Sequence, residues 1–200
     1  MTRTTRATVR TTAVLAALTL GLTGCSSFTP PWSEPTATPT PTPTATAEQP
    51  VPNDLSSGST AREMVAGPLD VSIDYWSTLS MDQWNAGVLK PVSVSLTTEI
   101  TPDDGQSVYL QRATMIATPA SATETFDPLS AQIDSATTSP GYLVIDPYSY
   151  TQTFMVGAVP EGATYVTLQF TYEFLVQSTP TSSDYAKQTA SETLTVAIAP

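Results

Sequence analysis

Residues 164–177 read TYVTLQFTYEFLVQ, and this stretch decides the fold. Apolar and polar side chains alternate along its length. One face carries Val166, Leu168, Phe170, Tyr172, Phe174 and Val176, and the other carries Tyr165, Thr167, Gln169, Thr171, Glu173, Leu175 and Gln177. Since successive side chains of a strand point to opposite faces of a sheet, this period of two predicts a long β-strand with one buried side.

The same alternation recurs on both sides of this stretch. It predicts further strands at residues 69–76, 92–100, 107–117, 141–145, 148–159 and 194–198. Turn-forming residues separate them, and Pro102-Asp103-Asp104-Gly105 and Pro160-Glu161-Gly162 each predict a hairpin loop. About seven strands, most with one polar face, predict an all-β fold, an antiparallel β-sandwich. This layout resembles that of immunoglobulin-like domains, without the paired cysteines of antibody domains.

Helical signals are sparse. Ser80-Met81-Asp82-Gln83 has the spacing of a capping box and predicts a single turn that stops near Gly87. Residues 119–140 show little strand pattern, and we expect a long loop there with a short helix near residues 128–133. The domain expected over residues 60–200 is long enough to bury a core without disulfides.

The N-terminal segment carries a different pattern. Arg3, Arg6 and Arg10 precede an apolar run, AVLAALTLGL at residues 13–22, which is too short to span a bilayer. The run leads into Leu22-Thr23-Gly24-Cys25, and Cys25 is the only cysteine of the chain. These residues resemble the lipobox of bacterial lipoproteins. The resemblance implies a signal peptide over residues 1–24, cleavage before Cys25, and a lipid on its thiol that holds the mature chain at the extracytoplasmic side of the cell membrane.

Proline and threonine dominate the segment that follows the cysteine. Residues 36–44 alone read TATPTPTPT. Proline has no amide donor and a fixed φ, so neither a helix nor a central strand is expected. We predict a disordered tether over residues 25–59. An extended chain of this kind rises about 3.1 Å per residue, which gives a reach on the order of 100 Å.

The charge balance excludes some partners. Arg62, Lys90, Arg112 and Lys187 are the only cations after Cys25, whereas all 18 acidic residues lie there, so the mature chain carries a formal charge of −14. Nucleic acid and anionic lipid headgroups are therefore not expected as partners, because few lysines and arginines are present to neutralise phosphate.

The residue inventory also excludes several classes of catalytic site. The chain contains no histidine, which removes the commonest general base and the Ser–His–Asp and Cys–His arrangements. No GxGxxG or GxxxxGK[ST] motif is present, so no nucleotide cofactor is expected. Asp103-Asp104-Gly105 resembles the start of a calcium loop, but the residues that follow lack the further ligands, which favours a solvated turn.

Asp70, Asp74, Trp76 and Trp84 form the candidate ligand surface. Asp70 and Asp74 lie about 13 Å apart along one strand face, which is too far to share a proton and wider than the usual pair of glycosidase carboxylates. Trp76 falls on the polar face of the same strand and Trp84 in the loop after it. These two rings are suited either to stacking on a sugar or partner, or to packing at the rim of the sandwich.

Three tyrosines offer a second candidate aromatic surface. They are Tyr142, Tyr148 and Tyr150. However, Tyr148 and Tyr150 share the alternation of Phe154 and Val156, which favours core positions for both.

These observations favour a non-enzymatic surface lipoprotein that presents a β-sandwich binding or structural module to the cell envelope. Its expected partners are the membrane, through the lipid on Cys25, and an envelope glycan or protein. The alternative is a carbohydrate-binding or carboxylate-dependent carbohydrate-active module. Two clustered carboxylates beside Trp76 would favour the alternative, and an exposed aromatic patch without paired acids would favour binding.

Overall fold

The computed structural model describes residues 50–200. Residues 1–49 contain the predicted signal peptide, Cys25 and most of the predicted tether, and these predictions fall outside the described residues. Within residues 50–200, no helix has both the length and the apolar character needed to cross a membrane.

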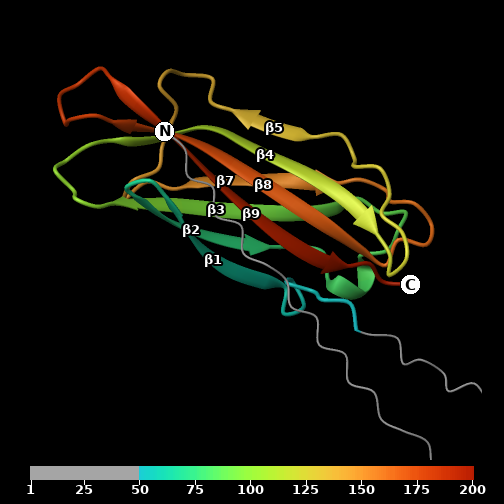
Figure 1. Ribbon diagram of the computed structural model, residues 1–200. Helices are drawn as coiled ribbons and strands as arrows, with labels where there is room; N and C mark the ends of the chain where they lie inside the picture. Colours follow the sequence, from blue (N-terminus) through green and yellow to red (C-terminus); the bar gives the residue numbers. More distant parts are fainter. Residues whose placement is uncertain (1–49) are drawn as a thin grey trace, which may run out of the picture. The chain divides into compact units, whose positions relative to one another are not determined.

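Two antiparallel sheets form the domain, and their inner faces pack together (Figure 1). Sheet A has the strand order β1 (Ser59–Ala66), β2 (Leu69–Trp76), β3 (Lys90–Ile100) and β7 (Tyr150–Val156). Sheet B has the order β5 (Gln132–Ser135), β4 (Val108–Ala120), β8 (Tyr165–Gln177) and β9 (Tyr185–Ala197), and the short β6 (Tyr142–Leu143) also pairs with β4. The predicted all-β sandwich is confirmed.

The core lies between the sheets and follows the alternation seen in the sequence. In β8, every second residue from Val166 to Val176 is buried. Phe170 lies at the centre of an aromatic cluster, with its ring centroid 4.9 Å from that of Tyr75 on β2 and 5.7 Å from that of Phe154 on β7. Side chains from both sheets therefore fill the same interior, as burial of one face of each sheet requires.

The two loops predicted as hairpins connect the sheets instead. The loop that contains Pro102–Gly105 runs from β3 in sheet A to β4 in sheet B, and the loop that contains Pro160–Gly162 runs from β7 to β8. Turn residues show that the chain reverses, but they do not determine whether the next strand pairs beside the last one or across the sandwich. The shortest hairpin turn is Gly67-Pro68 between β1 and β2, where Gly67 has a φ of 63° that glycine adopts without strain.

Three strands differ from the sequence prediction, and each is an edge strand. The expected short helix near residues 128–133 is wrong, because β5 begins at Gln132 and pairs with β4. The final strand starts at Tyr185 rather than near residue 194. Strand β1 was not predicted, because Thr60 and Arg62 occupy inward positions that are apolar in the central strands.

The folded part also begins before the predicted boundary at residue 60. Leu55 is fully buried in the core, and Asp54 pairs with β9. The predicted single helical turn is present as η1 (Met81–Gln83), but Ser80 makes no capping hydrogen bond through its side chain. Packing of this loop against the end of the sandwich, rather than a capping box, therefore holds the turn.

Candidate functional site

Three of the four candidate ligand residues lie together on the outer face of sheet A. We define this face as the side chains of sheet A that point away from sheet B. In β2 the buried residues alternate with Asp70 and Asp74, which are exposed, and with Trp76, which is partly exposed. The prediction that these three share one face is therefore confirmed.

Trp84 does not belong to this surface. Its side chain is fully buried, its indole N–H donates to Ser77 Oγ at 3.1 Å, and its carbonyl accepts from the amide of Ala199. The single turn of η1 carries the chain back over the end of the sandwich and turns this ring inward. Trp84 therefore cannot contact a ligand. Of the two roles considered for it, packing at the rim of the sandwich is the one that its burial supports.

Trp76 ends β2 and is partly exposed on this face. Its directly opposed partner on β3 is Ser93, which points to the outer face and yet is only 5% exposed. Ser93 Oγ shares a 2.8 Å hydrogen bond with Thr153 Oγ1 on β7. Ser93 therefore has Trp76 and Thr153 as its two cross-strand neighbours on this face.

The charged residues of this face are all carboxylates. The exposed Glu63, Asp70, Asp74 and Glu99 lie on β1, β2 and β3. Asp70 and Glu99 are directly opposed across β2 and β3, an arrangement that is unfavourable for like charges. Because no cation lies among the outward residues of these strands, the face presents a single sign of charge.

All four cations of residues 50–200 are engaged elsewhere. Arg62 pairs with Asp54 at 2.8 Å. On sheet B, Lys187 lies 2.7 Å and Arg112 3.7 Å from carboxylate oxygens of Glu173, and the hydrogen bond from Lys187 lowers the pKa of that carboxyl.

Lys90, the fourth cation, is fully buried at one end of the sandwich. Its ammonium donates to the carbonyl oxygens of Val88 at 2.7 Å, Asn85 at 3.0 Å and Gly157 at 3.1 Å. Burial lowers the pKa of this ammonium, since desolvation penalises the charged form, while the three acceptors oppose that effect. The arrangement joins the loop before β3 to the loop after β7, and the amine of Lys90 is not exposed to act as a base or a nucleophile.

The tyrosine candidates separate into buried and exposed residues. Tyr150 is 6% exposed, and its hydroxyl donates to Asp134 at 2.8 Å, with the ring of Tyr142 beside it at 5.6 Å between centroids. Burial is the largest cause that raises the pKa of Tyr150, and the nearby carboxylate of Asp134 raises it further. Tyr148 is 55% exposed, so its predicted core position is wrong. It precedes β7 and follows no strand period, which is why alternation misplaces it.

The Asp103–Asp104 loop is a hydrogen-bonded turn. Asp103 Oδ1 accepts from the amide of Gly105 at 2.9 Å, and Gly105 has a φ of 90°. No group of three or more acidic residues in the described part of the chain is arranged to hold a metal ion.

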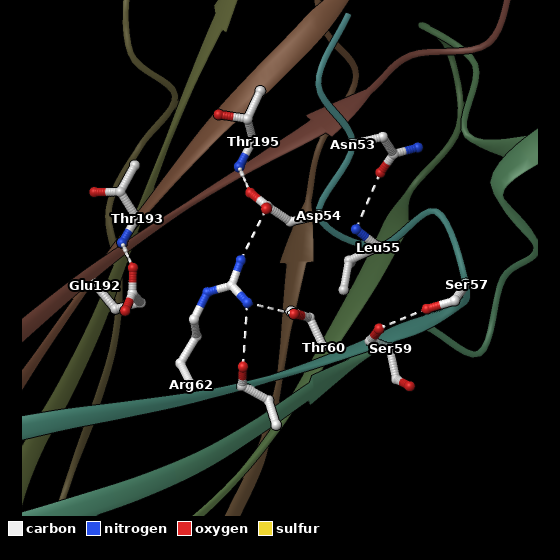
Figure 2. A network of polar contacts seen from close by, with 11 residues as sticks. Asn53, Asp54, Leu55, Ser57, Ser59, Thr60, Arg62, Glu192, Thr193 and Thr195 are labelled. Carbon is white, nitrogen blue, oxygen red and sulfur yellow. Dashed lines mark hydrogen bonds and ion pairs between the residues drawn. The ribbon is translucent and has the colours of Figure 1, made fainter.

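Sequence reasoning missed a polar network where the chain enters the domain (Figure 2). Asp54 Oδ2 accepts from the amide of Thr195 on β9 at 2.7 Å, and its own amide donates to the Thr195 carbonyl at 2.8 Å. Its other oxygen, Oδ1, accepts from Arg62 Nη2 on β1 at 2.8 Å, and Arg62 Nη1 donates to Thr60 Oγ1. Asp54 thus joins the edge strands of the two sheets. The only sequence signal for this network was Arg62, a charged residue at a position of β1 where the alternation would place an inward side chain.

A scan against models of known protein families and a search of curated proteins both found no match to this chain.

Proposed function

We propose that this protein is a non-enzymatic lipoprotein, held at the extracytoplasmic side of the cell membrane by a lipid on Cys25. A Pro/Thr-rich tether then presents the β-sandwich to the cell envelope as a binding or structural module. The order of segments carries the proposal. A charged and apolar leader ends in Leu22-Thr23-Gly24-Cys25, a proline-rich segment follows, and a folded domain comes after it.

The non-enzymatic part of the proposal is supported by the placement of the candidate acids. Asp70 and Asp74 are exposed on a sheet face and separated by Ser72. The cross-strand neighbours of Asp74 are Ala61 and Ser95, whereas Asp70 opposes Val65 and the exposed Glu99. General acid–base catalysis favours carboxyls whose pKa values are shifted by burial or by a specific partner. These two carboxyls are not buried, and the chain has no histidine to take that role.

Replacement of Cys25 tests the anchor. In a bacterial host, wild-type protein should incorporate labelled palmitate and partition with the membrane, whereas Cys25→Ser should do neither. Ser26→Ala, one residue further on, is the matched control and should behave like wild type. Membrane retention and labelling of Cys25→Ser would overturn the proposal, because two or more acyl chains are the source of stable anchoring.

A carbohydrate-binding module is the second candidate, and the partly exposed ring of Trp76 beside Asp74 is the observation that favours it. Soluble peptidoglycan fragments at about 100 times their Kd should stabilise the full chain by about 2.7 kcal/mol. The shift should disappear in Trp76→Ala and persist in Trp32→Ala, which changes a tryptophan of the predicted tether. No shift at any concentration would remove this candidate.

A further inference from the structure

We propose that the outer face of sheet A docks a cationic protein segment, with an arginine or lysine of the partner stacked on Trp76 and paired with Asp74. This names the partner class of the binding module proposed above and therefore rests on that function. It does not depend on the lipid anchor, so the two can fail separately.

The distribution of charge is the first argument. Glu63, Asp70, Asp74 and Glu99 point outward from three adjacent strands. Asp70 and Glu99 directly oppose each other, which costs the isolated domain stability that an arriving cation would restore. A positively charged partner is attracted by each of these carboxylates, which favours binding. The negative field of the face also speeds the approach of such a partner.

The position of Trp76 is a second and independent argument. Its side chain is partly exposed and lies on the same sheet face as the carboxylates, so part of an indole π-surface is available there. Cations bind over indole rings, and arginine does so most often because its planar guanidinium stacks. Asp74 projects from the same face two residues away, where it can accept from the guanidinium that stacks on the ring.

A second copy of the domain does not fit this face. Arg62 and Lys90 are engaged with Asp54 and with buried carbonyls. The two remaining cations, on the outer face of sheet B, share the carboxylate of Glu173, which leaves one net positive charge to meet four negative ones. The complementary charge therefore has to come from a different protein.

The chemistry favours a protein segment over a neutral glycan. A neutral glycan can stack on Trp76 and donate its hydroxyls to the carboxylates, but it leaves the opposed pair Asp70–Glu99 unneutralised. The face also carries an apolar edge, since Val65 on β1 is 73% exposed and directly opposes Asp70. Aromatic and apolar contacts among complementary charges are typical of protein interfaces.

The test measures binding of an alternating Arg-Thr octapeptide, blocked at both ends, to the purified full chain by titration calorimetry. A Gln-Thr octapeptide is the neutral probe, and chitohexaose is the glycan probe. Two double variants remove equal charge: Asp70→Asn with Glu99→Gln on the face, and Asp103→Asn with Asp104→Asn in the loop between β3 and β4. Trp76→Ala removes the ring, and a thermal scan of each variant confirms that it is folded.

We expect the Arg-Thr peptide to bind, and the Gln-Thr peptide to bind at least tenfold more weakly. The face variant should lose about tenfold in affinity, and Trp76→Ala a similar factor, whereas the loop variant should lose less than about threefold. Equal losses in the two charge variants would show attraction to net charge alone and would overturn the proposal. Unchanged binding by Trp76→Ala, or Trp76-dependent binding of chitohexaose in place of the peptide, would also overturn it.

Discussion

Two tyrosine hydroxyls meet in the centre of the sandwich. Tyr75 on β2 and Tyr172 on β8 are both fully buried, and their hydroxyl oxygens lie 3.1 Å apart. Burial, the largest cause, raises the pKa of both side chains. The two hydroxyls share one hydrogen bond, in which one donates and the other accepts, and this bond is a polar contact between the sheets.

The pair should behave as one unit in a double-mutant cycle. Tyr75→Phe leaves the Tyr172 hydroxyl without its partner and should cost about 1–3 kcal/mol of unfolding free energy in urea titrations. The double variant Tyr75→Phe/Tyr172→Phe should recover most of this loss, because neither hydroxyl is then stranded. If the two single losses simply add in the double variant, the two hydroxyls are not hydrogen-bonded to each other.

The buried ammonium of Lys90 should stabilise the loops at its end of the sandwich. Lys90→Met leaves three carbonyl acceptors without their donor and should lower the unfolding free energy by about 1–3 kcal/mol at pH 7. Lys187→Met, which breaks an exposed ion pair with Glu173, should lower it by less than about 1 kcal/mol.

The pH dependence of this effect has a defined sign. Because the pKa of Lys90 is lowered in the folded state, the unfolded chain binds more protons at alkaline pH, and wild-type stability relative to Lys90→Met should rise towards pH about 10. A Lys90→Met variant as stable as wild type at pH 7 would show that the desolvation cost cancels the three hydrogen bonds.

At the level of the strands, Asp54 pairs beside the edge strand β9 and also holds β1 through Arg62. Asp54→Ala removes the acceptor for both the Thr195 amide and Arg62, whereas Asp54→Asn retains an oxygen for the amide. We expect losses of about 1–2 kcal/mol for alanine and under about 1 kcal/mol for asparagine, since the ion pair is partly exposed. Hydrogen exchange should show faster exchange of the Thr195 amide in Asp54→Ala only. Equal exchange rates of the Thr195 amide in both variants would mean that the Asp54 side chain does not protect this amide.

Strands with uniformly apolar inward faces could be predicted from the sequence. β2 and β8 are of this kind, and every inward residue in them is buried. β1 and the first half of β9 could not, because edge strands keep polar side chains such as Arg62 and Gln188 at inward positions near the open side of the sandwich. The sequence also did not predict which strands pair with each other, since turn residues do not specify which sheet the next strand joins.

For the candidate site, too, residues on strands could be placed from the sequence, whereas residues in loops could not. Asp70, Asp74 and Trp76 share a strand, so their common face followed from alternation alone. Trp84 lies in a loop, where no period indicates which way a side chain points, and the structure places it in the core. The acceptors of Lys90 come from residues 85, 88 and 157, which only the completed fold brings together.

Over the whole molecule, charge is distributed unevenly between the two outer faces. The outer face of sheet A carries four exposed carboxylates, whereas the central carboxylate of sheet B, Glu173, is neutralised by Arg112 and Lys187. The rest of the outer face of sheet B is rich in threonine, including Thr114, Thr167, Thr171 and Thr193. Electrostatic repulsion in the folded state therefore originates mainly from sheet A and the loops.

This imbalance predicts that the folded chain gains stability when salt is added. Raising sodium chloride from about 10 to 150 mM shortens the Debye length from about 30 to 8 Å, which screens repulsion between carboxylates on separate strands and loops. The same salt weakens the exposed ion pairs, but each contributes less than about 1 kcal/mol, so the loss of repulsion dominates. Each kcal/mol gained should raise the Tm by roughly 2–4 °C in calorimetric scans. Asp70→Asn/Glu99→Gln should have a higher Tm at low salt and a smaller response to salt, because it removes the directly opposed pair. A Tm that falls as salt is added would mean that the ion pairs outweigh the acidic face.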